Sequence, residues 1–237
     1  MKNATLLIYS LLFVVTAYGQ SSEMSLKLNS GLFSFSGASA QSSSFFNYNM
    51  SSQDGHTNNP YGSKGGLSIG FSTDLTRVSQ NNFLVGLDLG YELLRSRTRI
   101  KEIITYDQVV TTSVNADGRT NLNLSFLNLF PKMGYRWILS DINIDLVGGM
   151  DLAYCFNAHE HGKATADGRT FSTQRERKTI ALDMRPRVQV HVKQGNYGVY
   201  VGYSRGLIDY RADYVGGTNR ANGNIFRFGM SYLLKRN

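Results

Sequence analysis

Hydrophobic and polar residues alternate along much of the chain. The clearest example covers residues 179–193, where every second residue from Ile180 to Val192 is apolar and most residues between them are polar or charged. A period of two places the two sets on opposite faces of a β-strand. Pro186 lies inside this segment and predicts a β-bulge or a lost ladder hydrogen bond, because proline has no backbone N–H.

Similar alternation predicts eight strands in total. Most are close to the length of about nine to eleven residues with which a tilted strand crosses a bilayer. In the first strand the alternation changes phase midway. The expected strands cover residues 25–35, 66–73, 83–93, 122–130, 142–156, 179–193, 196–204 and 225–234.

The links between these strands alternate in length. Short links cover residues 75–82, 136–141 and 193–196, whereas the other links are long and polar, as in residues 36–65. Outer-membrane barrels have this pattern, with short periplasmic turns and longer outward loops. The sequence predicts an all-β fold, an eight-stranded antiparallel up-and-down transmembrane β-barrel with both termini in the periplasm.

A sheet in a bilayer must close, because backbone N–H and C=O groups cannot face hydrocarbon unpaired. The apolar face then points outward to lipid and the polar face points into the lumen. A soluble, exported, lipocalin-like ligand-binding barrel would invert this arrangement and is one alternative. The membrane interpretation therefore requires Leu87, Leu146, Val188 and Val190 to lie on the outside.

The polar face predicts a plugged lumen. Nine charged residues fall on it, and opposite charges should pair there because isolated buried charges are costly. An eight-stranded barrel is just wide enough for side chains to fill it. The expected lumen charges are Lys27, Asp88, Glu92, Asp145, Asp151, Asp183, Arg185, Arg187 and Arg227.

Aromatic residues occur where two interfacial girdles are expected. One girdle is expected at the short-turn end and the other near the long links. The first contains Phe83, Trp137, Tyr197 and Tyr232, and the second contains Tyr91, Tyr154, Phe156, Tyr203 and Phe226.

The first 19 residues predict a cleaved signal peptide. Lys2 precedes an apolar stretch at residues 6–15, and Ala17 and Gly19 place small residues before the cleavage point. Residues 20–237 then form one outer-membrane barrel domain. Cys155 is the only cysteine, so no disulfide forms within the chain, and a packing role is expected for it.

The net charge and the spacing of the basic residues limit the classes of partner that are expected. The chain has a net charge of +8, but its Lys and Arg residues are mostly scattered singly, which does not favour nucleic acid. The expected partners are outer-membrane lipid, lipopolysaccharide, and secretion or envelope proteins. We expect a monomer without a cofactor.

Candidate chemistry is sparse, and we predict no catalytic, cofactor-binding or metal-binding residues. The His159-Glu160-His161 cluster lacks the spacing of a zinc site and is expected in an exposed loop. The pentapeptide ADGRT occurs at residues 116–120 and 166–170, and both copies are expected to form turns. The chain is therefore predicted not to be an enzyme. The alternative is an outer-membrane lipid-modifying enzyme that uses His191, with Asp183 on the same strand face.

Three blocks resemble a known family. The residues LSFLNLFPKMGYRW (124–137), VYVGYSRGLIDY (199–210) and FRFGMSYLLKRN (226–237) are similar to strands of the Bacteroidota outer-membrane β-barrel domain family. The PorT-like branch of that family has this layout and length. The resemblance implies an outer-membrane location and a structural or accessory role in the envelope or in a secretion assembly.

Overall fold

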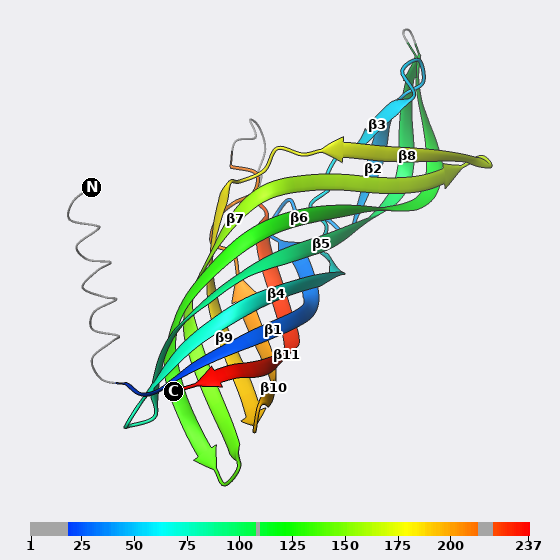
Figure 1. The fold of residues 1–237 in the computed structure, drawn as a ribbon. Coiled ribbons are helices and arrows are strands. Elements are labelled where there is room, and N and C mark those ends of the chain that lie inside the picture. Colours follow the sequence, from blue (N-terminus) through cyan, green and yellow to red (C-terminus); the bar gives the residue numbers. More distant parts are fainter. Residues whose placement is uncertain (1–18, 108–109, 213–219) are drawn as a thin grey trace.

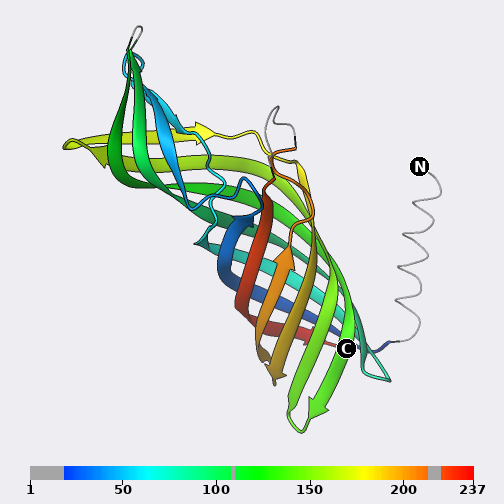
Figure 2. The same ribbon diagram turned by 180° about the vertical axis from the view of Figure 1, so that it is seen from behind.

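Eight strands form a closed barrel in the computed structural model, which describes residues 19–107, 110–212 and 220–237 (Figures 1 and 2). Each wall strand pairs antiparallel with its neighbour along the chain, and the first pairs with the last. The fold is therefore the predicted all-β up-and-down barrel. The wall strands are β1 (Gly19–Ser36), β4 (Lys64–Ser79), β5 (Phe83–Asp107), β6 (Val110–Leu139), β7 (Ile142–Ala166), β9 (Leu182–Gln194), β10 (Tyr197–Arg205) and β11 (Asn222–Arg236).

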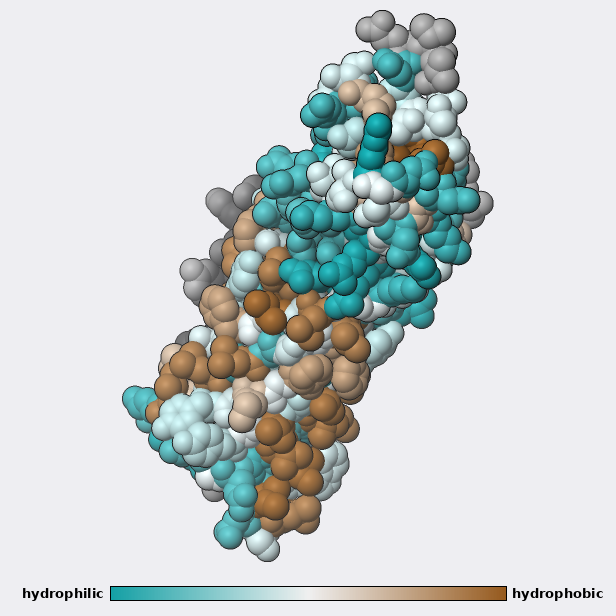
Figure 3. Space-filling model, turned by 90° about the vertical axis from the view of Figure 1, so that its right-hand side faces the viewer, coloured by the Kyte–Doolittle hydropathy of each residue, from teal (hydrophilic) through white to brown (hydrophobic). Residues whose placement is uncertain are grey.

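The outer wall of the barrel is apolar, as predicted. The exposed fraction is 37% for Leu87, 40% for Leu146, 57% for Val188 and 37% for Val190. Figure 3 shows hydrophobic side chains gathered over the barrel and hydrophilic ones beyond it. A soluble barrel would bury these residues in its interior, so the arrangement contradicts the lipocalin-like alternative.

Three tight turns form one end of the barrel, here called the turn end. They follow β4, β6 and β9 and link each strand to the next in two or three residues. Asn82, Ser140 and Gly195 in these turns have positive φ angles of 62°, 53° and 56°. The short links predicted from the sequence are confirmed.

At the opposite end, three strands continue far beyond the barrel. β5, β6 and β7 have 25, 30 and 25 residues, more than twice the length of about ten that crosses a bilayer. Together with three short strands they form what we call the extension: residues 95–107, 110–123 and 159–166 with β2 (Ser43–Asn49), β3 (Asp54–Thr57) and β8 (Arg169–Glu176). β2 pairs parallel with β5, and β8 pairs with β7 (Figure 1).

The extension has its own small hydrophobic core. Phe46 of β2 and Ile100 and Ile103 of β5 are fully buried, and they pack with Ala164 and Ala166 of β7. Much of the sequence expected to be loop is therefore packed β-structure. Ser96, Thr98 and Ile100 face inward and continue the period of two beyond the predicted boundary, as far as the register shift between Ile100 and Glu102.

The two ADGRT copies have different structures. The second is a tight turn between β7 and β8, with φ angles of 49° at Asp167 and 73° at Gly168, as predicted. The first lies inside β6, so the prediction of a turn there was wrong. A Cβ at Gly118 would come within 2.3 Å of the Lys163 carbonyl oxygen, so glycine serves close strand approach at this copy.

β1 keeps a single register where the sequence suggests a change of phase. Leu28 and Leu32 are exposed, whereas Phe33 and Phe35 point inward and are buried. The apparent shift arises because aromatic residues occupy the inner face near the extension.

Pro186 introduces no bulge. The β7–β9 register runs without a shift through the Met150–Pro186 pair. The β9–β10 ladder ends at the Arg187–Ser204 pair, and Arg187 directly follows the proline in the chain. Pro186 thus lies where β9 has no partner on that side, and its missing N–H costs no ladder bond there.

We expect the folded protein to show heat-modifiable mobility in a detergent gel. Eight closed ladders leave no edge for detergent to open, so an unheated sample should migrate as a compact species and a boiled one as an unfolded chain. Identical mobility of heated and unheated samples would contradict a closed barrel.

Candidate functional site

Charged side chains fill the half of the lumen nearer the turn end. Among the described residues, seven acidic and seven basic side chains lie there, and all but the half-buried Lys193 are buried. The acidic residues are Glu23, Asp74, Asp88, Glu92, Asp145, Asp151 and Asp183, and the basic residues are Lys27, Lys132, Arg136, Arg185, Arg187, Lys193 and Arg227.

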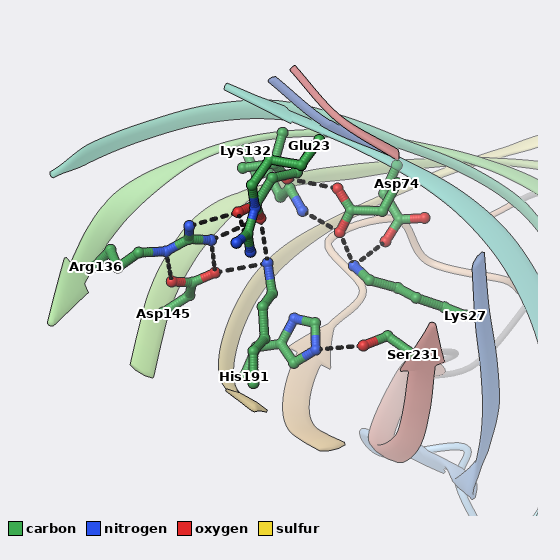
Figure 4. A network of polar contacts seen from close by, with 12 residues as sticks. Glu23, Lys27, Asp74, Lys132, Arg136, Asp145, His191 and Ser231 are labelled. Carbon is green, nitrogen blue, oxygen red and sulfur yellow. Dashed lines mark hydrogen bonds and ion pairs between the residues drawn. The ribbon is translucent and has the colours of Figure 1, made fainter. Parts of the chain in front are cut away.

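The cluster nearest the turn end centres on Arg136 (Figure 4). Its guanidinium donates to both carboxylate oxygens of Glu23 at 2.7 and 2.8 Å, and to those of Asp145 at 2.6 and 2.8 Å. Lys193 lies 3.0 Å from Glu23 and 2.9 Å from Asp145. These bidentate pairs connect β1, β6, β7 and β9 across the lumen.

A second cluster lies deeper and joins β1, β4, β5 and β6. The ammonium of Lys27 donates to Asp88 at 2.9 Å and forms an ion pair with Asp74. Lys132 donates to the same Asp74 carboxylate at 2.5 Å. The two lysines and two aspartates leave no net charge at this depth.

A third cluster surrounds Arg227 of β11. Its guanidinium binds both oxygens of Glu92, with one contact at 2.8 Å, and lies 2.8 Å from Asp151. Asn128 donates to Glu92 at 2.6 Å. The cluster around this buried arginine therefore links four strands, β5, β6, β7 and β11.

Aromatic side chains close the lumen towards the extension. Arg185 donates to Asp183 at 2.7 Å and lies 4.3 Å from the centre of the Phe126 ring. The hydroxyl of Tyr210 donates to the same aspartate at 2.8 Å. Above this layer is a hydrophobic core that includes Phe33, Phe35, Tyr61, Leu94, Leu122 and Leu124. The plug is thus ionic in one half and apolar in the other, rather than polar throughout.

All nine predicted lumen charges point inward and are buried. The prediction missed five charges. Glu23, Asp74, Lys132 and Arg136 lie outside the segments read as strands, and Lys193 is the last residue of one of those segments. Lys132 and Arg136 follow Asn128 at intervals of four, so extending the alternation of β6 would have found them.

His191 lies in the lumen and is hydrogen-bonded to Ser231, with 2.7 Å between Nε2 and Oγ. The imidazole packs on Tyr200, with ring centres 5.6 Å apart. Asp183 bonds to Arg185 and Tyr210 where the charged half of the lumen meets the aromatic layer, so it does not complete a triad with this pair. The cavity beside Ser231 has a volume of about 10 Å³, the size of one water molecule.

The His159-Glu160-His161 cluster lies in β7, not in a loop as predicted. The alternation of the strand turns both histidines outward and buries Glu160 completely. The Glu160 carboxylate accepts hydrogen bonds from Thr57 of β3 and Thr173 of β8 and pairs with Arg177. It therefore holds β3 and β8 against β7. No group of three metal-ligating side chains occurs in the described part of the chain.

Two smaller features concern titratable groups. Burial, together with the positive charges of Arg177 and Arg175, lowers the pKa of His56 in the extension. A neutral His56 imidazole suits its contact with the Asn47 amide at 3.4 Å.

Cys155 is a free thiol with 8% of its surface exposed and belongs to the lumen core, which fits the expected packing role.

The sequence matches the model of the outer membrane protein beta-barrel domain over residues 17–211. The chain belongs to this family. It is therefore an outer-membrane β-barrel protein, with its short turns in the periplasm and its long connections, including the extension, outside. No helix among residues 19–107, 110–212 and 220–237 is long and apolar enough to cross a membrane.

Solved barrels show a distant likeness, and a search of curated proteins found no match. Neisserial surface protein A is 8% identical, with a TM-score of 0.34, 90% of this chain covered and 97% of that chain covered. Ail, the attachment invasion locus protein of Yersinia pestis, is 11% identical, with a TM-score of 0.34 and coverages of 93% and 99%. Because these scores are low, the barrel assignment rests on the strand pairing and the family match.

The outer-membrane barrel carries aromatic side chains at both ends of its apolar wall, in the two girdles predicted from the sequence. Tyr197 and Tyr232 pair across β10 and β11 at the periplasmic end, with ring centres 5.3 Å apart. Tyr91 and Phe156 lie near the extension, with ring centres 6.1 Å apart. The predicted signal peptide lies outside the described residues except for Gly19, with which β1 begins.

We expect the Arg227→Met variant to be destabilised by about 3–5 kcal/mol, because it leaves buried carboxylates without their main cation. Urea unfolding in phospholipid vesicles measures the change. Adding Glu92→Gln and Asp151→Asn to the variant should recover much of the loss.

Arg205→Met is the matched control, since Arg205 is exposed on the neighbouring β10. Its effect should stay within about 0.5 kcal/mol. Equal effects of the two single variants would show that the ion network contributes nothing particular to stability.

Proposed function

We propose that the protein is a non-channel anchor that holds the extension at the cell surface as an accessory component of the envelope. The filled lumen is the observation that carries this proposal. Salt-bridged clusters at three depths and an aromatic layer above them occupy the barrel interior. The described interior cavity beside Asn128 and Phe130 has a volume of only about 10 Å³.

The extension is the part of the molecule that differs most from a plain barrel. It has a hydrophobic core, a buried carboxylate that binds two short strands, and a β-strand connection to the wall. A rigid sheet fixed to a rigid plug suits a docking role, because little conformational entropy remains to be lost on binding.

We also propose that the accessory role is that of a PorT-like protein in a secretion or envelope assembly. Support comes from the three resembling blocks, which lie in β6, in β10 with the following residues, and in β11. A PorT-like assignment is more specific than membership of the outer membrane protein beta-barrel family.

We further propose that the protein is not an enzyme. The His191–Ser231 pair is the arrangement that most favours the alternative, a lipid-modifying enzyme, because serine and histidine at hydrogen-bond distance can form a nucleophile and its base. His191 and Ser231 have exposed fractions of only 3% and 7%, and a cavity the size of one water adjoins them. A lipid ester could not reach Ser231 without breaking the ion clusters.

Planar-bilayer recordings should show no steady conductance for the mature protein, since paired side chains block the lumen throughout. A porin with a water-filled lumen, recorded under the same conditions, is the channel-forming control. Stable single-barrel openings in the wild type would overturn the anchor proposal.

Deletion of the gene should change the profile of secreted and surface proteins and leave lipid A and phospholipid profiles unaltered. A His191→Phe, Ser231→Ala variant should complement the deletion as well as the wild type does. An altered lipid profile that only the wild type restores would favour the lipid-modifying enzyme. An unchanged protein profile would contradict the accessory role.

A further inference from the structure

A row of cations crosses the outer face of the extension. Arg99 of β5 lies directly opposite Arg119 of β6, which lies directly opposite Lys163 of β7. All three are exposed, and the residues directly before and after each of them in its strand face the other way. Like charges in directly opposed positions of a sheet are destabilising. The one carboxylate at the row is Asp117, paired with Arg99 at 2.8 Å.

Further cations and polar groups continue this face towards the barrel. The next row contains Lys64, Arg97, Asn121, His161 and Gln174 on five adjacent strands, and the row below it contains Arg95, Asn123, His159 and Glu176. We call these three rows the cationic face. The Arg95 guanidinium donates to Asn123 at 2.7 Å, which holds that side chain flat along the sheet.

The cationic face is hollowed where the rows of Arg119 and Asn121 meet. A concavity of about 440 Å³ is lined by Asp117, Gly118, Arg119, Asn121, His161 and Lys163. This volume is within the range of about 300–1,000 Å³ for sites that take small ligands or headgroups. The lining offers guanidinium, ammonium, amide and imidazole donors, which suit phosphate oxygens.

The cationic face begins where the lipid-facing wall ends. On β5 the outward residues change from Leu89 and Tyr91 to Arg95 within four positions, which is about 13 Å along a strand. On β6 they change from Leu127 to Asn123 in the same interval. Figure 3 shows hydrophilic side chains directly above the hydrophobic ones. The lower rows are thus at the level of the outer-leaflet headgroups.

We propose that the cationic face binds the phosphate groups of lipopolysaccharide in the outer leaflet around the barrel. A phosphate between Arg119 and Lys163 would relieve the repulsion along the first row. Continuity with the apolar wall favours a membrane glycolipid over a soluble polyanion, because the acyl chains can pack on the wall while the phosphates reach the cations. The proposal rests on the outward orientation of the extension and not on the closed lumen.

The test uses the full-length protein in non-ionic detergent, titrated with rough lipopolysaccharide and followed by thermophoresis. The key variant is Arg119→Gln, Lys163→Gln. Each cation near an anionic lipid surface contributes a factor of about five in affinity, corresponding to about 1 kcal/mol. The double variant should therefore bind about 25-fold more weakly and show a smaller dependence on salt.

The matched control is Arg175→Gln, Lys178→Gln, which removes two exposed cations elsewhere in the outward part of the protein. Arg175 lies directly opposite the inward-facing Glu160 in the β7–β8 ladder. Its side chain therefore starts on the face of the sheet opposite to the cationic face. The control should change affinity by less than two-fold. Equal weakening by both variants would reduce the effect to net charge and overturn the site.

Two further ligands distinguish the source of the phosphate. Lipopolysaccharide stripped of phosphate should bind the wild type and the key variant equally weakly, and inorganic phosphate should compete only at high concentration. Tight binding of the stripped glycolipid would overturn the proposal. A soluble sulfated polysaccharide that binds the wild type as tightly as lipopolysaccharide does would replace the membrane ligand with a soluble polyanion.

Folding of the key variant is checked by its heat-modifiable mobility and its urea midpoint, which should be unchanged or higher because a like-charge pair is removed. A conducting lumen would overturn the anchor proposal and leave this binding test unaffected. Equal affinities of the wild type and the key variant for lipopolysaccharide would overturn the glycolipid site and leave the lumen measurement unaffected.

Discussion

The structure depends on one constraint: the backbone of a membrane-crossing strand must find all its hydrogen-bond partners in neighbouring strands. Closure of the β1–β11 ladder satisfies this constraint. Closure also fixes which face of every strand meets lipid, since side chains alternate with a period of two. Apolar residues such as Val188 must then point out, and the charges beside them on the chain, such as Arg187, are forced into a narrow interior.

That confinement explains the composition of the lumen. A buried arginine without a carboxylate would cost several kcal/mol, so each of the four lumen arginines except Arg187 lies within 4.0 Å of a carboxylate. Arg187 instead contacts Gln189 and stacks on Phe130 at 4.4 Å. Paired charges that join four or more strands make the barrel rigid and closed. This filling is the basis for our proposal that the protein acts through its outer surface and its outward end.

The sequence predicted the wall because hydrocarbon outside and charge inside impose opposite residue types on alternate positions. The inward placement of Arg185 and Asp183 follows from that period alone. The same logic failed where both faces have similar polarity. In the half of the barrel near the extension, both the inner and the outer face of the wall are apolar. The inward-facing Phe33 and Phe35 therefore made β1 look as if its alternation changed phase. In the extension, Glu160 is buried and Lys163 exposed among neighbours of equal polarity, so no period marked a strand. Pairing between β7 and β8 is a tertiary property that local pattern does not encode.

Arginine has opposite surroundings in the two parts of the molecule. In the lumen, Arg136 has two carboxylates and both are fully engaged. On the cationic face, Arg119 lies between Arg99 and Lys163, and the Asp117 carboxylate pairs with Arg99. Closure of the barrel explains the paired charges of the lumen, but it does not explain three cations side by side on the exterior. The imbalance destabilises the isolated chain, and the phosphate proposed above would relieve it.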